Sequence, residues 1–102
     1  MKIAVASEAT EPSSEISTQG ARAINYLIFD GFGKEQEILS NPYVDIDKGA
    51  GPKVAQMLVQ IGVTTVIAGR FGPKFKSALI DSNIECIETN GLVIQAVKEY
   101  LE

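Results

Sequence analysis

The second half of the chain alternates between helix-like and strand-like segments, and this alternation restricts the fold more than any other feature. Segment Pro52–Ile61 carries apolar residues at the i, i+3, i+4, i+7 spacing of a half-buried helix. The next run, Thr64–Ala68, is apolar and β-branched, as buried strands are. A helix over Pro73–Ser82, a strand over Ile84–Ile87 and a last helix from about Leu92 continue the pattern. This order predicts an α/β fold with parallel strands joined by right-handed crossovers.

The first half predicts three strands, over Lys2–Ala6, Asn25–Asp30 and Glu35–Leu39. Gly31-Phe32-Gly33 suits the turn of a hairpin between the second and third strands. Two stretches without periodicity, Ser7–Ala23 and Ser40–Gly51, are expected to be loops, and long loops in small domains are often functional or mobile. The complete order, β-β-β-α-β-α-β-α, predicts a mixed sheet of five strands with three helices.

Length and charge limit the classes of protein to consider. The chain has 102 residues, of which 45% are hydrophobic, so we expect one domain over residues 1–102. The net charge of −4 argues against a general nucleic-acid or anionic-membrane binder, which needs a basic face. No window approaches the apolar length of a membrane span, and the short apolar start is too brief for a signal peptide. We therefore expect a cytoplasmic protein that binds neither nucleic acid nor membrane.

The chain contains one cysteine, Cys86, and no histidine. Without histidine, the commonest zinc ligand and the commonest general base are both missing, so a simple zinc site, a Ser-His-Asp hydrolase and a Cys-His protease are disfavoured. We interpret Cys86 as a small, inward-facing apolar residue of the strand Ile84–Ile87. The serines and glutamates of Ser7–Ala23 are interpreted as turn residues and solvated charges.

Two similar tripeptides, Gly51-Pro52-Lys53 and Gly72-Pro73-Lys74, open two of the expected helices. Crossover geometry places both helix starts, and the start of the last helix, at the carboxyl edge of the sheet, where open α/β sheets bind ligands. Helix N-termini attract anions, whereas lysines in a first turn are mildly unfavourable. The arrangement indicates either an anion site or ordinary helix starts with solvated lysines.

Arg70 follows Gly69 and precedes Phe71 and Gly72 at the same edge. We expect both glycines to adopt backbone angles closed to other residues and to allow close approach. Arg70 would then extend a long cation over the ligand edge. The alternative is that Arg70 is structural and ties the Ser7–Ala23 loop to the sheet.

The sequence resembles the dinitrogenase iron–molybdenum cofactor biosynthesis family, the NifX-like small domains. The resemblance rests on four stretches that cover most of the chain, of which Gly49 to Gly72 is the most specific: MKIAVAS, GARAINYLIFD, GAGPKVAQMLVQIGVTTVIAGRFGPKFKSAL and NGLVIQAVKEYL. It implies a ribonuclease H-like fold with strand order 3-2-1-4-5 and an antiparallel second strand.

The resemblance also implies a function, which is to bind or carry an iron–sulfur–molybdenum cofactor or its precursor without catalysis. Family members often have His-Phe-Gly before the second strand, where this chain has Thr18-Gln19-Gly20. The soft nitrogen ligand of that motif is absent here. With the edge residues, these three positions complete the expected cofactor-binding set: Gly51, Lys53, Gly69, Arg70, Gly72, Lys74, Thr18, Gln19 and Gly20.

Three functions are left to compare. The first is a non-enzymatic carrier of an anionic metal cofactor, such as an iron–sulfur or iron–molybdenum cluster, or of another small anion. The second is a regulatory or interaction domain of the same fold, with a protein partner or a second copy of itself, that has lost cluster binding. The third, a ribonuclease H-type nuclease, is disfavoured because the strand Lys2–Ala6 and the strand Thr64–Ala68 lack the carboxylates that hold two metals.

Overall fold

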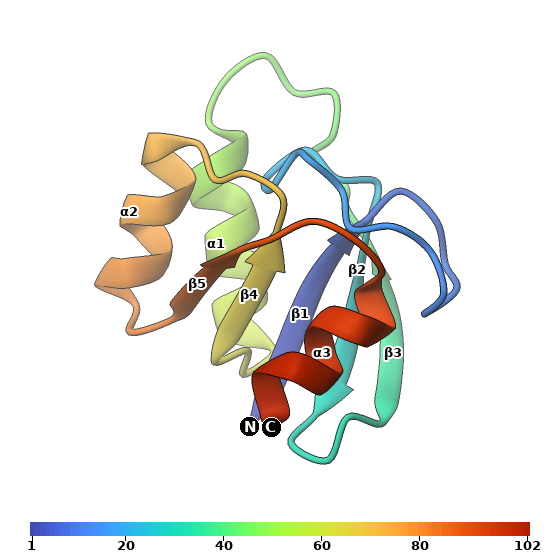
Figure 1. Ribbon diagram of the computed structural model, residues 1–102. Coiled ribbons are helices and arrows are strands. Elements are labelled where there is room, and N and C mark those ends of the chain that lie inside the picture. Colours follow the sequence, from blue (N-terminus) through green and yellow to red (C-terminus); the bar gives the residue numbers. More distant parts are fainter.

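The computed structural model describes residues 1–102 as a five-stranded sheet with helices on both faces (Figure 1). The elements are β1 (Lys2–Ser7), β2 (Asn25–Asp30), β3 (Glu35–Ser40), α1 (Ala50–Gln60), β4 (Thr65–Ala68), α2 (Pro73–Asp81), β5 (Glu85–Glu88) and α3 (Val93–Leu101). The strand order is β3-β2-β1-β4-β5, with β2 antiparallel to both neighbours and β4 parallel to β1 and β5. The predicted mixed sheet and its order are confirmed.

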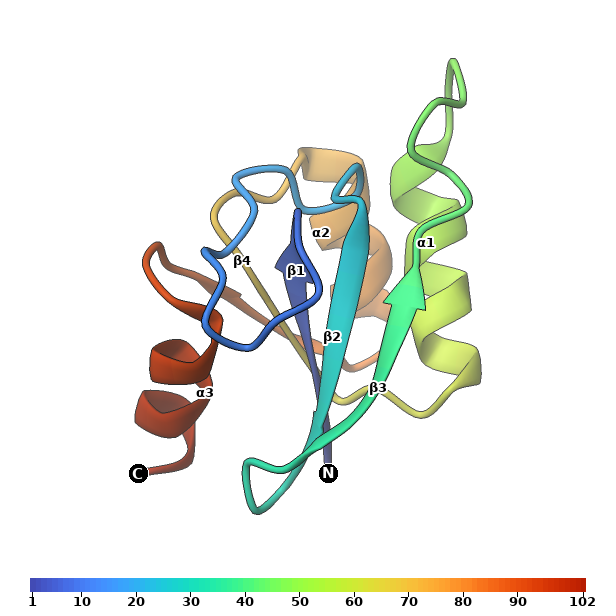
Figure 2. The same ribbon diagram turned by 90° about the vertical axis from the view of Figure 1, so that its right-hand side faces the viewer.

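The sheet separates two apolar cores, which follow from the period-2 alternation of the central strand. Ala4 and Ala6 of β1 face α1 and α2, whereas Ile3 and Val5 face α3. Figure 2 shows α3 on one side of the sheet and α1 with α2 on the other. The small alanines of β1 leave room for the larger Phe75, Leu58 and Leu79 from the two-helix face. No helix is long and apolar enough to cross a membrane.

Most predicted boundaries differ from the structure by one residue, but the start of α1 differs by two. The helix begins at Ala50, so Gly51 and Pro52 are its second and third residues and do not precede it. The N-cap is Gly49, whose φ of 80° lies in the left-handed region that favours glycine. Pro52 fits inside the first turn because the N–H that it lacks would have no helical acceptor there.

The segment between β1 and β2 is anchored more firmly than its composition suggested. Ile16 pairs with Ser7, and Glu15 pairs with Leu92, as isolated β-bridges. The backbone N–H groups of Ser17 and Gly69 donate to the carbonyls of Ala6 and Ser17, each at 2.8 Å. The loop is therefore fastened to the carboxyl ends of β1 and β4.

Candidate functional site

Two adjoining hollows lie at the carboxyl edge of the sheet, one of about 470 Å³ and one of about 300 Å³. They share Ala21, Arg22 and Gly72, and we call the combined feature the edge groove. Its remaining walls come from the loop before β2, the loop before α1 and the starts of α1 and α2. These residues are Thr18, Gln19, Gly20, Asp47, Lys48, Gly49, Ala50, Gly51, Pro52, Arg70, Pro73, Lys74 and Phe75.

Both helices that open on the edge groove begin with unpartnered N–H groups. Neither Gly49 nor Gly72 has a side chain to cap its helix, and neither first turn contains an acid. The first backbone bonds of the two helices come from Lys53 to Gly49 and from Lys76 to Gly72. The N–H groups of Ala50, Gly51, Lys74 and Phe75 have no acceptor in the protein. Two positive dipole ends and four donors therefore meet in one place.

The close approach of these two helix starts depends on Gly51. A Cβ at this position would lie 2.8 Å from the backbone nitrogen of Phe75 and 3.0 Å from its Cα. Any side chain there would push α1 and α2 apart. Phe75 is itself buried and stacks on Phe71, with ring centroids 5.6 Å apart, so it cannot give way easily.

Gly20 fits against the same aromatic pair from the loop before β2. A Cβ on Gly20 would lie 2.7 Å from the Arg70 carbonyl oxygen and 3.0 Å from the Phe75 ring. The Gly20 N–H donates to that carbonyl at 3.0 Å, and the buried Tyr26 hydroxyl donates to the Gly20 carbonyl. Burial, and secondarily the charge of Glu8, raises the pKa of Tyr26, which keeps this hydroxyl protonated as a donor.

Further side chains fix the rest of this wall. Asn41 Nδ2 donates to the carbonyls of Ala21 and Ala23 at 2.9 and 2.8 Å. Glu8, expected to be a solvated charge, instead accepts from Ser17 Oγ at 2.8 Å and from the Ile24 N–H at 3.0 Å. The carboxylate bridges the two sides of the loop, and the sequence shows no local pattern that would reveal this.

Arg22 connects the two walls of the edge groove. Its Nη1 donates to the carbonyls of Val44 and Ile46, at 2.9 and 2.8 Å, and its Nη2 lies 3.5 Å from the Asp47 carbonyl. It thereby holds the loop that leads into α1. Arg22 was not among the predicted site residues, since a lone arginine in a loop gives no signal of the carbonyls it will meet.

The edge groove is cationic although the protein is acidic. Its lining includes Arg22, Lys48, Arg70 and Lys74 and one acid, Asp47, a net charge of +3 on a chain of net charge −4. The Arg70 side chain is exposed and makes no hydrogen bond within the protein, whereas its carbonyl holds Gly20. The backbone of Arg70 thus performs the structural tie, and its guanidinium is left free for a ligand.

Of the nine predicted site residues, seven line the edge groove: Thr18, Gln19, Gly20, Gly51, Arg70, Gly72 and Lys74. Lys53 lies outside, with its ammonium 5.8 Å from the centre of the Tyr43 ring. Gly69 lies beneath the loop, where a Cβ would come within 2.9 Å of Thr18 Cα. The conformational reason expected for Gly69 and Gly72 was wrong, because neither has a positive φ.

The start of the third helix lies at the predicted carboxyl edge of the sheet, but it does not open on the groove. The N–H groups of Val93 and Ile94 donate to the carbonyls of Ser14 and Pro12, each at 2.9 Å. The loop before β2 therefore caps α3 and removes it as an anion site.

Direct metal ligation has few candidate residues. No group of three or more His, Cys, Asp or Glu side chains is placed to hold a metal ion. Cys86 lies on the edge strand β5, outside the groove and only partly buried, and burial raises the pKa of its thiol. The groove therefore offers N–H donors and cations, which suit the acceptor atoms of a whole anion.

These features define a class of protein: an α/β domain with a cationic groove at the carboxyl edge of its sheet. The family model for the dinitrogenase iron–molybdenum cofactor matches residues 1–102, and the chain belongs to that family.

Two solved structures are similar over nearly the whole chain. The apo form of the orange protein from Desulfovibrio gigas is 29% identical, with a TM-score of 0.91 over 98% of this chain and 86% of that one. An NMR structure of a candidate NifB protein from Thermotoga is 30% identical, with a TM-score of 0.81 over 97% of this chain and 85% of that one. None of the curated proteins matches the chain.

Proposed function

We propose that the protein is a non-enzymatic carrier that binds an anionic iron–molybdenum cofactor, or an iron–sulfur precursor of it, in the edge groove. Family membership supports the class of ligand. The observation that carries the proposal is the groove itself, where two uncapped helix starts and four cations converge on an acidic protein. Without a ligand these like charges and dipoles repel one another, and a multiply charged anion would relieve that conflict.

In this proposal the ligand is cargo held through its outer atoms. The backbone donors of Ala50, Gly51, Lys74 and Phe75 would bind sulfide, oxide or carboxylate acceptors of the cluster. Arg70 and Lys74 would neutralise charge from the open side. Thr18 and Gln19, at the position of the family's His-Phe-Gly motif, would add polar contacts in place of a metal–nitrogen bond. Such binding leaves the cargo exchangeable, as a carrier requires.

The test is anaerobic reconstitution with iron, sulfide and molybdate, followed by absorbance and metal analysis. We expect the wild-type protein to retain a metal–sulfur species and Arg70→Ala to bind it about ten- to a hundredfold more weakly, since a charge-assisted contact is worth about 1.5–3 kcal/mol. Lys53→Ala, which removes a cation outside the groove, is the matched control and should bind as the wild type does.

The same experiment separates the proposal from its alternatives. A large fall in melting temperature for Arg70→Ala, with unchanged binding, would make Arg70 part of the scaffold. No retained metal in any variant would favour the second function, a regulatory or interaction domain that has lost the cluster site. The absence of histidine and the distance of Cys86 from the groove are what keep that alternative open.

A further inference from the structure

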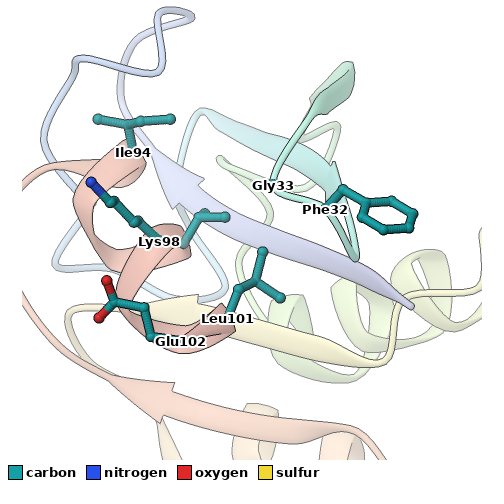
Figure 3. A pocket seen from close by; sticks show the side chains of 7 residues that line it. Phe32, Gly33, Ile94, Lys98, Leu101 and Glu102 are labelled. Carbon is teal, nitrogen blue, oxygen red and sulfur yellow. The ribbon is translucent and has the colours of Figure 1, made fainter.

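We infer that the protein self-associates through the end of the molecule opposite the edge groove, as a two-fold dimer in which Phe32 of each copy enters an apolar hollow of the other. The hollow measures about 330 Å³ and lies between the β2–β3 turn and α3 (Figure 3). Its lining is Phe32, Gly33, Ile94, Val97, Lys98, Leu101 and Glu102. The dimer does not require the proposed cargo.

Phe32 is the most exposed large apolar side chain of the protein, with 97% of its surface accessible. In Figure 3 its ring extends from the turn into solvent, away from the hollow that its backbone borders. Ile94, 42% exposed, lies on α3 at the same hollow, and Met1, 66% exposed, packs beside the turn at Gly31. A projecting aromatic ring thus stands next to an apolar hollow on one face.

The turn that presents Phe32 is held by the Asp30 carboxylate. Asp30 Oδ1 accepts from the N–H groups of Phe32 and Lys34 at 2.8 and 3.0 Å, and Oδ2 accepts from Gln36 at 3.1 Å. The Asp30 N–H also donates to the Lys34 carbonyl at 2.9 Å. An aromatic ring on a preordered turn loses little conformational entropy on binding, which is the property of an interface anchor.

A projection and a hollow side by side are self-complementary under a two-fold rotation, because each copy then offers the part that the other accepts. The charge of the hollow also favours a second copy of the protein as its partner. The hollow carries one cation, Lys98, and one acid, Glu102, so its net charge is zero on a protein of net charge −4. Two copies can therefore meet here without the repulsion that separates acidic surfaces, or that two edge grooves of charge +3 would suffer.

The two-fold arrangement also pairs Lys98 of one copy with Glu102 of the other. No ion pair joins these residues within a chain, although Glu102, the C-cap residue of α3, follows Lys98 by four positions, so both charges are free. The edge groove, at the other end of the strands, would be open in both copies.

The experiment is sedimentation velocity of the full chain over a concentration series, for the wild type, Phe32→Ser and Ile80→Ser. Ile80, 54% exposed on α2, is an apolar control away from the hollow. We expect a reversible dimer for the wild type and Ile80→Ser. Phe32→Ser should weaken it about a hundredfold or more, since each dimer buries two rings. A wild type that is monomeric at every concentration overturns the proposal, as does a dimer equally stable in Phe32→Ser.

A charge reversal supplies the second readout. Lys98→Glu alone should weaken the dimer by placing two acids together, and adding Glu102→Lys should restore it. A double variant no better than the single one would contradict the two-fold pairing of these residues. Because the edge groove is remote, Phe32→Ser should retain the reconstituted metal–sulfur species as the wild type does, so failure of the dimer and failure of cargo binding are distinguishable.

Discussion

The helices α1, α2 and α3 all start at the same edge of the sheet, yet they differ in whether their first backbone N–H groups have hydrogen-bond acceptors. The first N–H groups of α3 donate to the Ser14 and Pro12 carbonyls, so this helix end is satisfied by the chain itself. The corresponding groups of α1 and α2 have no acceptor, no capping side chain and no acid nearby in the first turn. The contrast shows that this edge of the sheet is not an anion site as a whole. The two open helices, α1 and α2, lie on one face of the sheet (Figure 1). The cations of the edge groove gather at their starts.

The largest expected effect comes from separating the two open helix starts. Gly51→Ala puts a Cβ within 2.8 Å of the Phe75 backbone nitrogen. We expect it to lower the free energy of unfolding by about 1–3 kcal/mol through overpacking, measured by chemical denaturation. At Gly72 a Cβ would meet nothing within 4 Å, so Gly72→Ala should lower the free energy of unfolding by less than about 1 kcal/mol. Equal costs for the two variants would mean that α1 and α2 do not meet closely at Gly51.

The buried Tyr26 hydroxyl that holds the Gly20 carbonyl predicts a pH dependence. Burial raises the pKa of Tyr26 in the folded protein, so its stabilising contribution is complete below the unfolded value of about 10 and is lost as pH rises beyond that. The free energy of unfolding should fall by up to about 1.4 kcal/mol per pH unit above pH 10 on this account. Tyr26→Phe should remove this part of the slope. An unchanged slope would show that Tyr26 ionises freely in the folded protein.

Capping one of the open helices should make stability and binding change in opposite directions. Gly72 has the extended backbone of an ordinary N-cap and open space around it. In Gly72→Asp, the new carboxylate would accept hydrogen bonds from the free N–H groups of α2 and would place a negative charge at the positive N-terminus of this helix. Both effects together should stabilise the fold by about 0.5–1 kcal/mol. The same carboxylate would compete with an anionic ligand, so retention of the reconstituted metal–sulfur species should fall at least about tenfold. A variant that is more stable and still binds fully would place the ligand elsewhere.

The smallest effect should distinguish the two lysines of the repeated tripeptide. Lys74 lines the edge groove, whereas Lys53 lies over the Tyr43 ring outside it. Lys74→Ala should weaken anion binding up to about fivefold, as expected for an exposed charge, and Lys53→Ala should leave it unchanged. Isothermal titration with molybdate at low ionic strength would measure both. A stronger effect of Lys53→Ala would reverse the assignment.

The fold could be predicted because its signals are local. The stripe of Pro52–Ile61, the β-branched run of Thr64–Ala68 and the Gly-Pro breaks each report on neighbouring residues, and the crossover rule then predicts that the last strands are parallel. The order of the strands was implied by the family resemblance. Arg70 and Lys74 lie at the carboxyl edge of the sheet, as predicted, because the order of helices and strands alone places them there. The separation of open from capped helices could not be predicted, because it depends on carbonyls about eighty positions from α3 in the sequence.

The finer structure of the groove could not be predicted either, because it also depends on contacts between residues that are distant in the sequence. Arg22 and Glu8 act through backbone groups that only the folded loop brings near them. The need for glycine at Gly51 is steric and depends on what lies opposite. At Gly69 the expected close approach is present, whereas the expected backbone angle is not. Residues that make contacts across the chain leave no periodic trace in the sequence.

The most direct test of the central claim is an NMR titration that follows the backbone amides of all three helix starts while molybdate is added as the anion. We predict saturable shifts at Ala50, Gly51, Lys74 and Phe75, whose N–H groups are free, and none at Val93 and Ile94, whose N–H groups are already bonded. Shifts that are absent from α1 and α2, or equally large at the start of α3, would contradict the account.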